Sequence, residues 1–308
     1  MQDIYQQTIS EPIFFEGIGL HSGKISKVRL LPGEENQGII FKRTDINENN
    51  IIKAIYDNVT SAKLCTTLEN SSGSKISTVE HLLAAFYIIG IDNITVEVSN
   101  EEIPIMDGSS KDFIKILNRV GTKKLNKKRK YLKVLNKVEI EDNGRSISIE
   151  PNGLDFEVIF QLNYSNNIIG KQKNKINFST DNLEDVYSSR TFCLFEDIEK
   201  IKKIGLAKGG SLENAVVVDE DKVINEEGLR NEKEFVNHKI LDLAGDFLLS
   251  GYRILGTINC YQGGHQLSNM FLRKLLKSKS SFVKIELDKT ELTNKATVTQ
   301  PIKLAVNA

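Results

Sequence analysis

The chain has 308 residues, and its 41 lysines and arginines are balanced by 41 aspartates and glutamates, so the formal net charge is zero. This balance gives no electrostatic reason to expect nucleic acid or an anionic membrane as a partner. The longest apolar stretch, residues 82–91, is too short to span a bilayer, and the first residues lack the basic and apolar regions of a signal peptide.

Cysteine usage bears on the cellular compartment. Cys65, Cys193 and Cys260 are scattered, show no metal or redox spacing and cannot all pair with one another. A reducing cytoplasm suits such a chain. We therefore expect a cytoplasmic protein without a transmembrane segment, built as one large domain or as two domains of moderate size.

The first part of the sequence mixes short strands with helices. Runs of β-branched and apolar residues between turn signals indicate the strands, and apolar periodicity ended by Gly90 indicates the main helix. The predicted strands are 28–32, 38–43 and 93–99, and the predicted helices are 77–89 and 112–120.

Residues 121–130 follow these elements and are basic, polar and without periodicity. We interpret them as a solvated connection between two domains rather than as a nucleic-acid patch. Beyond them the same mixture of elements returns. The predicted strands are 131–134, 138–141, 146–150, 156–162 and 253–259, and the predicted helix is 232–250, ended by Gly251.

The long second-half helix carries a row of polar residues on an apolar background. His238 and Asp242 are four residues apart, so they share one face of the helix, and Asp246 extends the row. The apolar flanks predict a mostly buried helix. Two stacked carboxylates in such a place need a positive partner. A divalent metal held by His238 and Asp242 would provide it, and a buried histidine paired with a carboxylate explains the pattern equally well.

The first helix begins with a second polar group. Ser77 and Glu80 have the spacing of a capping box, which would give Glu80 a purely structural role. The alternative is a metal ligand at His81 beside a general base at Glu80, since adjacent helix positions point roughly 100° apart. With His238 and Asp242, His81 would complete three nitrogen and oxygen ligands and leave a fourth position open, as in catalytic zinc sites.

Three further positions carry weaker signals. His265 follows two glycines at a strand end, where a backbone can approach a ligand, and Asp246 could orient its ring. The hydroxyl of Thr191 could donate to an oxyanion. His21 lies in a glycine-rich turn that is not a phosphate fingerprint, because no helix follows it. Taken alone, each is equally well explained as a loop residue.

Together these stretches resemble the zinc-dependent UDP-3-O-acyl-N-acetylglucosamine deacetylases, which commit Gram-negative bacteria to lipid A synthesis. The matching segments run in family order over nearly the whole chain. They are 17–23, 41–45, 76–82, 90–94, 102–109, 190–192, 209–211, 217–219, 225–230, 234–246 and 264–265. Ser268 and residues 231–233 depart from the family pattern, which puts fine substrate contacts in doubt but touches no proposed ligand.

The resemblance implies a role for each residue of the metal group. His81, His238 and Asp242 correspond to the zinc ligands, with Fe²⁺ as an alternative ion. Glu80 corresponds to the general base that activates water. The zinc ion would acidify that water and polarise the substrate carbonyl.

The resemblance also implies the residues that face the substrate. His265, oriented by Asp246, corresponds to the group that stabilises the oxyanion and protonates the leaving amine. Thr191 corresponds to a hydroxyl that binds the oxyanion. The implied substrate contacts are Lys239, Phe192, Phe160 near the uracil, and His21 at a position close to the site.

The fold implied by the family is α+β, with two related two-layer α/β sandwich domains and the active site between them. The boundary at the basic segment gives domains 1–126 and 127–308, the second with an acyl-channel insert at about 192–215. In that insert, Leu194, Ile198, Ile201 and Ile204 fall at helical spacings on one side. Such a stripe is typical of a protein core, and only the resemblance favours an acyl channel.

The expected activity is hydrolysis of the N-acetyl amide of UDP-3-O-acyl-N-acetylglucosamine, with release of acetate, by a monomeric enzyme. One alternative is a zinc amidohydrolase acting on another acylated sugar or on a peptide. Another is a non-catalytic binder of a lipid or sugar nucleotide. Glu80, Asp246 and His265 argue against the binder, because binding alone requires neither a base nor an acid.

Overall fold

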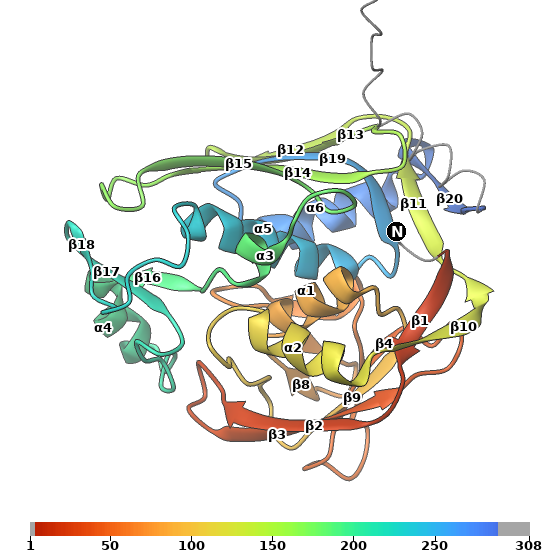
Figure 1. The fold of residues 1–308 in the computed structure, drawn as a ribbon, viewed down its shortest axis with the longest axis horizontal. Coiled ribbons are helices and arrows are strands. Elements are labelled where there is room, and N and C mark those ends of the chain that lie inside the picture. The colour runs from red at the N-terminus through yellow and green to blue at the C-terminus, as the bar shows by residue number, and fades with distance from the viewer. Residues whose placement is uncertain (1–3, 289–308) are drawn as a thin grey trace, which may run out of the picture.

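The computed structural model describes residues 4–288; residues 1–3 and 289–308, at the outer ends of the two predicted domains, lie outside the described part. The elements stack in four layers, with a sheet on each outer side and helices filling the space between them (Figure 1). This arrangement is an α+β fold, as expected. No helix in residues 4–288 is both long and apolar enough to cross a membrane.

The first part of the chain forms the five-stranded sheet and the helices that cover its inner face. The strand order is β2 (Ile13–Ile18), β3 (Ile25–Pro32), β9 (Ile94–Val98), β4 (Ile39–Arg43) and β5 (Ile51–Lys53). All neighbours are antiparallel except β9 and β4. The covering helices are α1 (Glu80–Ile89) and α2 (Lys111–Val120). After β5 come the short helix η1 (Tyr56–Asn58) and a small sheet of β6 (Val59–Ser61), β7 (Thr67–Glu69) and β8 (Lys75–Ile76).

The second part forms the seven-stranded sheet. Its order is β12 (Val138–Asp142), β13 (Arg145–Glu150), β19 (Arg253–Tyr261), β11 (Lys130–Val134) and β20 (Phe282–Glu286), and β14 (Phe156–Asn163) pairs with both β19 and β15 (Lys171–Asn177). The helices of this part are α3 (Glu184–Tyr187), α5 (Glu234–Leu248), α6 (His265–Lys277) and η2 (Lys279–Ser281).

The predicted insert stands beside the four layers, at the left of Figure 1. It contains β16 (Phe192–Leu194) and α4 (Phe195–Lys203). The strands β17 (Val216–Asp219) and β18 (Lys222–Val223) follow directly after it and form a separate sheet with β16. No residue of α4 is buried. Ile198 and Ile201 of the predicted stripe are therefore not core residues, whereas Leu194 in β16 packs against the main core.

The main core lies between the two sheets, where α1 packs against α5. Eight consecutive residues of α1, from Glu80 to Tyr87, are buried, because the helix has the five-stranded sheet on one side and α5 on the other. In the sheet, the alternation of β3 puts Val28 and Leu30 inside and their neighbours outside. The two polar residues that open α1 are thus carried into the middle of the molecule.

Two sequence-based expectations about local structure are wrong. Ser77 does not cap α1: its amide and its hydroxyl both donate to the carbonyl oxygen of Glu101, and Glu80 bonds elsewhere. Residues 121–130 are not an irregular connection, because β10 (Thr122–Lys128) pairs antiparallel with β1 (Tyr5–Ile9). The lysines of β10 are mostly exposed, so this strand lacks the buried alternation that would have revealed it. The domain boundaries themselves stay a prediction.

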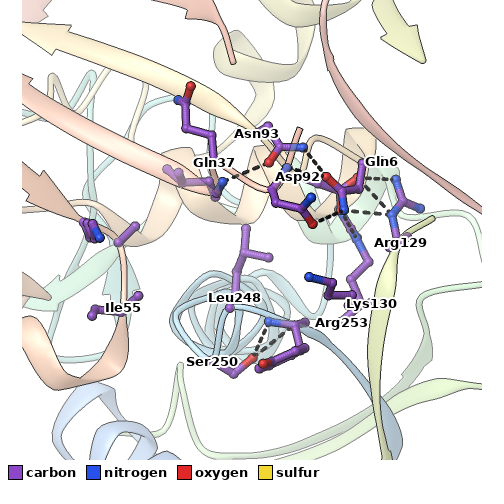
Figure 2. A pocket seen from close by; sticks show the side chains of 17 residues that line it. Gln6, Gln37, Ile55, Asp92, Asn93, Arg129, Lys130, Leu248, Ser250 and Arg253 are labelled. Carbon is purple, nitrogen blue, oxygen red and sulfur yellow. Dashed lines mark hydrogen bonds and ion pairs between the residues drawn. The ribbon is translucent and has the colours of Figure 1, made fainter. Parts of the chain in front are cut away.

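A polar network fastens the far end of α1, away from its first turn, and Figure 2 shows the side chains of its members Asp92, Arg129 and Arg253. Arg253 donates to the carbonyl oxygens of Phe86 and Tyr87, the latter at 2.6 Å, and Arg129 donates to that of Gly90 at 2.7 Å. The carboxylate of Asp92 bonds to both guanidinium groups. Cations at the last carbonyls of a helix satisfy them and complement its dipole. Elements of the second sheet thereby hold α1 in place.

Candidate metal centre and catalytic site

The site forms where α1 and α5 come into close contact. Gly245 of α5 faces the backbone of α1 so closely that a Cβ atom there would overlap the carbonyl oxygen of Glu80. This glycine lets the two helices approach, and the approach brings the start of α1 beside the middle of α5. His81 consequently lies next to His238 and Asp242, which are one turn apart on α5, as their spacing predicts.

Three candidate ligands converge at this contact. One donor atom from each of His81, His238 and Asp242 lies within 4.8 Å of the others, and all three residues are buried. Oδ1 of Asp242 is 3.4 Å from Nε2 of His81 and 3.3 Å from Nε2 of His238. The two imidazole rings are 5.0 Å apart between centroids and nearly perpendicular. The two imidazoles therefore lie side by side, as the sequence-based hypothesis requires.

The electrostatics of these residues suit metal ligands. Burial lowers the pKa of His238 to about 3, against the opposing pull of Asp242, so the ring is neutral at physiological pH. Its Nδ1 lies 3.1 Å from the carbonyl oxygen of Ser189, which can only accept, so Nδ1 carries the proton and Nε2 keeps its lone pair. Burial favours the protonated form of Asp242, but His238 and Lys239 hold its pKa well below the ordinary value.

The same geometry leaves a place for a cation. Oδ1 of Asp242 is buried and has no hydrogen-bond partner within residues 4–288, although it faces two imidazole nitrogens. Unsatisfied buried acceptors are costly. Two imidazoles and a carboxylate with an open side form a donor set that zinc and iron accept. The residues present therefore fit a divalent metal ion.

Glu80 lies at the start of α1 with its carboxylate beside the ligands, and only 2% of the residue is exposed. Its Oε2 accepts a hydrogen bond from the backbone amide of Thr66 at 3.0 Å, and its Oε1 is 3.7 Å from Nε2 of His265. Burial is the main cause that raises the pKa of Glu80 above the ordinary carboxyl value. A carboxylate with a raised pKa can accept a proton from water more readily.

His265 is the first residue of α6, and its ring lies next to the carboxylate of Glu80. Its Nδ1 is 2.9 Å from Oδ2 of Asp246, so the predicted orienting contact is present. Burial would lower the pKa of His265, but Asp246 and Glu80 outweigh it and raise the pKa to about 10. The ring is therefore a cation at neutral pH, next to a carboxylate that can serve as a base.

The loop that contains Gly108 and Ser110 makes hydrogen bonds both to the backbone of His81 and to that of Thr191. Ser110 donates from its hydroxyl to the carbonyl oxygen of His81 at 2.7 Å. In the same loop the carbonyl oxygen of Gly108 accepts the amide of Thr191 at 2.8 Å. Gly108 has φ of +84°, and a Cβ there would overlap the carbonyl of Asn214, so only glycine suits this position. Thr191 is thus fixed by its backbone at the edge of the site.

Arg190 secures the segment that precedes Thr191. It is fully buried, and its amide and its Nε both donate to Oε1 of Glu234, at 3.0 and 2.8 Å. It also pairs with Glu227. Glu234 opens α5, so this ion pair ties the start of the ligand-bearing helix to Ser189 and Thr191. A buried arginine is tolerated here because its charge and its donors are matched.

A largely apolar cavity of about 340 Å³ opens from Thr191 into the predicted insert. Ile198 and Ile201 of α4 line it, whereas Ile204 is 55% exposed and does not. His21 lines the same cavity, so the structure places it near the site, as expected. The remaining lining residues include Leu20, Phe192, Phe195, Ala207, Leu212, Ala215, Val217 and Ile224.

A second cavity, of about 410 Å³, adjoins the first and is more polar. The two share Leu64, Thr191, Phe192 and other residues along their common wall. Lys239 and His265 line the second cavity, and Nζ of Lys239 lies 2.9 Å from Oδ2 of Asp242.

Among the predicted substrate contacts, Phe160 is the exception. The residue is 1% exposed, belongs to the main core and lines neither cavity. Its place inside the sheet follows from the alternation of β14, which turns Phe160 toward the core together with Val158 and Leu162. Tyr164 lies further along the chain from β14 and lines the second cavity.

Several residues of the site carry no signal in the sequence. Thr66 and Ser189 take part through backbone atoms, which any residue type offers, and Thr66 lies 180 positions from Asp246, to which it also bonds. Arg145 lines the second cavity from the start of β13, where a single arginine is ordinary. Only its position in the wall of a cavity that Lys239 also lines marks it as a candidate.

The sequence matches the family model described as UDP-3-O-acyl N-acetylglycosamine deacetylase (LpxC) over residues 6–277. It is 40% identical over 289 residues to the UDP-3-O-acyl-N-acetylglucosamine deacetylase of Shewanella frigidimarina, which covers 93% of this chain and 94% of that protein. The protein of the same name from Geotalea uraniireducens is 39% identical over 301 residues, with 97% and 96% covered. That from Haemophilus ducreyi is 38% identical over 291 residues, with 94% and 95% covered.

Proposed function

The chain belongs to the UDP-3-O-acyl-N-acetylglucosamine deacetylase family, and we propose that it hydrolyses the N-acetyl amide of UDP-3-O-acyl-N-acetylglucosamine, in the pathway to lipid A. The observation that supports this most directly is the convergence of three candidate metal ligands, His81, His238 and Asp242. Next to them lie Glu80, the candidate base, and His265, the candidate acid. That combination is suited to hydrolysing an amide.

His81, His238 and Asp242 would hold the metal ion, which we propose to be zinc, with Fe²⁺ as the alternative. When bound, such an ion acidifies water and polarises a carbonyl group. Ser189 keeps His238 in the tautomer that presents Nε2, and Ser110 holds the backbone of His81.

The proton transfers belong to Glu80 and His265. Glu80 accepts a proton from the attacking water as the new bond from its oxygen to the amide carbon forms. Thr191 and the His265 imidazolium stabilise the negative charge that develops on the carbonyl oxygen. His265 then donates its proton to the sugar nitrogen as the carbon–nitrogen bond breaks. Acetate and the free amine leave, and Asp246 holds the His265 ring throughout.

The two cavities match the two ends of such a substrate. The apolar cavity inside the insert suits an acyl chain, and its entrance lies at Thr191. The polar cavity has Arg145 and Lys239 in its wall, which we assign to the diphosphate, because guanidinium and ammonium groups are good phosphate partners. Phe192 lies in the wall common to both cavities.

We test this proposal with one experiment on the purified full-length protein. Metal content is measured together with acetate release from UDP-3-O-acyl-N-acetylglucosamine, with and without a chelator. We expect about one zinc or iron per chain, acetate release, and loss of both on chelation. His238→Ala is the matched variant and should retain no stoichiometric metal. Stoichiometric metal in that variant would refute the ligand assignment.

Two alternatives are distinguished in the same assay. A metal-dependent amidohydrolase for another acylated sugar would release acetate from a simple N-acetyl sugar at least as fast as from the nucleotide substrate. A non-catalytic binder would retain the substrate and release no acetate. We further propose that the enzyme is a cytoplasmic monomer, since every site residue comes from one chain and the three thiols are free.

A further inference from the structure

Thr66 contacts both halves of the acid–base machinery. It lies between β6 and β7, is 2% exposed, and lines neither of the two cavities. Its hydroxyl is 2.7 Å from Oδ1 of Asp246, and its backbone amide is 3.0 Å from Oε2 of Glu80. Within residues 4–288, no other residue makes hydrogen bonds to both of these carboxylates.

The contacts of Thr66 close a ring. Oδ2 of Asp246 accepts a hydrogen bond from Nδ1 of His265 at 2.9 Å, and Nε2 of His265 lies 3.7 Å from Oε1 of Glu80. Each carboxylate therefore presents one oxygen to Thr66 and the other to His265. The terminal torsion of a carboxylate is soft, so a second partner on the far oxygen is what fixes the plane of the group.

We propose that Thr66 is a positioning residue, whose hydroxyl sets the plane of Asp246 and thereby aims His265 at the leaving nitrogen. Its amide does the same for Glu80, and that contact survives any side-chain replacement. The side chain thus acts on the protonating histidine through Asp246, without touching the substrate. This inference rests on the proposed hydrolase function, because it assigns Thr66 a part in that reaction.

The structure predicts which kinetic constant depends on this hydroxyl. The cavities that bind substrate do not include Thr66, so the KM should not change. The aim of His265 matters in the chemical steps, when charge develops on the carbonyl oxygen and when the amine departs, so kcat should fall. Loss of an outer-shell contact of this kind typically costs about 10–100-fold in activity.

The experiment compares two replacements in the full-length, zinc-loaded protein. Thr66→Val removes the hydroxyl and keeps the shape, and Thr66→Ser keeps the hydroxyl. Thr67→Val is the matched control, because it removes the neighbouring hydroxyl, whose one hydrogen-bond partner among the described residues 4–288 is the thiol of Cys65. The measurements are kcat and KM for acetate release, zinc content, and the melting temperature.

We expect Thr66→Val to lower kcat about 10–100-fold with KM and zinc content unchanged, while Thr66→Ser and Thr67→Val stay within about threefold of the unmodified protein. A Thr66→Val enzyme with normal kcat would overturn the inference, and so would a Thr66→Ser enzyme as slow as Thr66→Val. If the unmodified zinc-loaded protein released no acetate, the proposed function would fall instead, so the two failures are distinguishable.

Discussion

Glu80 and His265 approach within 3.7 Å, and the proposed mechanism requires them in opposite protonation states. Glu80 must be a carboxylate to take the water proton, and His265 must be an imidazolium to give one. Burial raises the pKa of Glu80, and Asp246 with Glu80 raises that of His265 to about 10 against the effect of burial. At neutral pH His265 is therefore the protonated member of the pair, which leaves Glu80 as the candidate base.

The first prediction concerns the base. Glu80→Gln keeps the size of the side chain and can still accept the Thr66 amide, but it cannot take a proton. We expect kcat to fall by at least about 100-fold, the usual scale for general acid–base catalysis. Zinc should stay bound, because Glu80 is not a ligand. Steady-state kinetics with metal analysis checks both, and normal turnover would remove Glu80 from this role.

The second prediction concerns the pH dependence of kcat/KM. Activity should rise with pH as Glu80 loses its proton and fall at alkaline pH as His265 loses its own, which gives a bell. Asp246 favours the charged form of His265, so Asp246→Asn lowers its pKa. The alkaline limb should move to lower pH while the acid limb changes less. An alkaline limb that does not move would assign that limb to another group.

At the level of single residues, sequence spacing predicts proximity only for site residues that lie on the same helix or strand. His238 and Asp242 follow from the period of one helix. His81 was joined to them by chemistry and by family resemblance, since no local pattern shows that α1 lies against α5. Thr66 could not be found at all, because its hydroxyl meets Asp246 only after the small sheet folds against α5.

At the scale of elements, the strands and helices with one buried face agree closely with the sequence pattern. The helix predicted over 232–250 is α5 at Glu234–Leu248, and the strand predicted over 156–162 is β14 at Phe156–Asn163. The strand β10 could not be predicted, because its pairing with β1 is remote in sequence and leaves its lysines in solvent. Local periodicity reports burial, and an exposed strand has little of it.

The third prediction concerns the element that encloses the apolar cavity. Ala215 lies just before β17 and lines that cavity. Ala215→Phe would occupy space that we assign to the acyl chain, while the metal ligands are on other elements. We expect the KM for a long-chain substrate to rise at least about tenfold, equivalent to about 1.4 kcal/mol.

The matched measurement uses a substrate with a short 3-O-acyl group, which does not reach into the cavity. Its KM should be nearly unchanged in Ala215→Phe. An equal loss for both substrates would indicate a general disturbance of the insert, and no loss for either would exclude this cavity as the acyl site.

At the scale of the whole molecule, the site depends on how closely the two sheet-and-helix layers approach. Gly245 sets that distance, because any side chain there meets the backbone of Glu80. The network of Asp92, Arg129 and Arg253 holds the other end of α1 against the second sheet. The helix is thus fixed at both ends, and its first turn carries Glu80 and His81.

The fourth prediction tests this packing. In an isolated helix, replacing glycine by alanine is stabilising by roughly 1 kcal/mol. Gly245→Ala should do the opposite here, because overpacking costs about 1–3 kcal/mol or more and forces α1 away from α5. We expect a lower free energy of unfolding in urea and weaker metal retention. A variant with higher stability and full metal content would show that the helices can separate without consequence.

The candidate ligands come from two helices, α1 and α5, that pack against different sheets. Metal binding is therefore coupled to the folding of both parts of the chain. A cation that binds only the assembled arrangement favours folding by mass action, by about 2.7 kcal/mol when its free concentration is a hundred times its dissociation constant. The supply of metal would then affect both the resistance of the protein to proteolysis and its catalytic rate. Depletion of the ion would therefore lower the folded fraction of this protein.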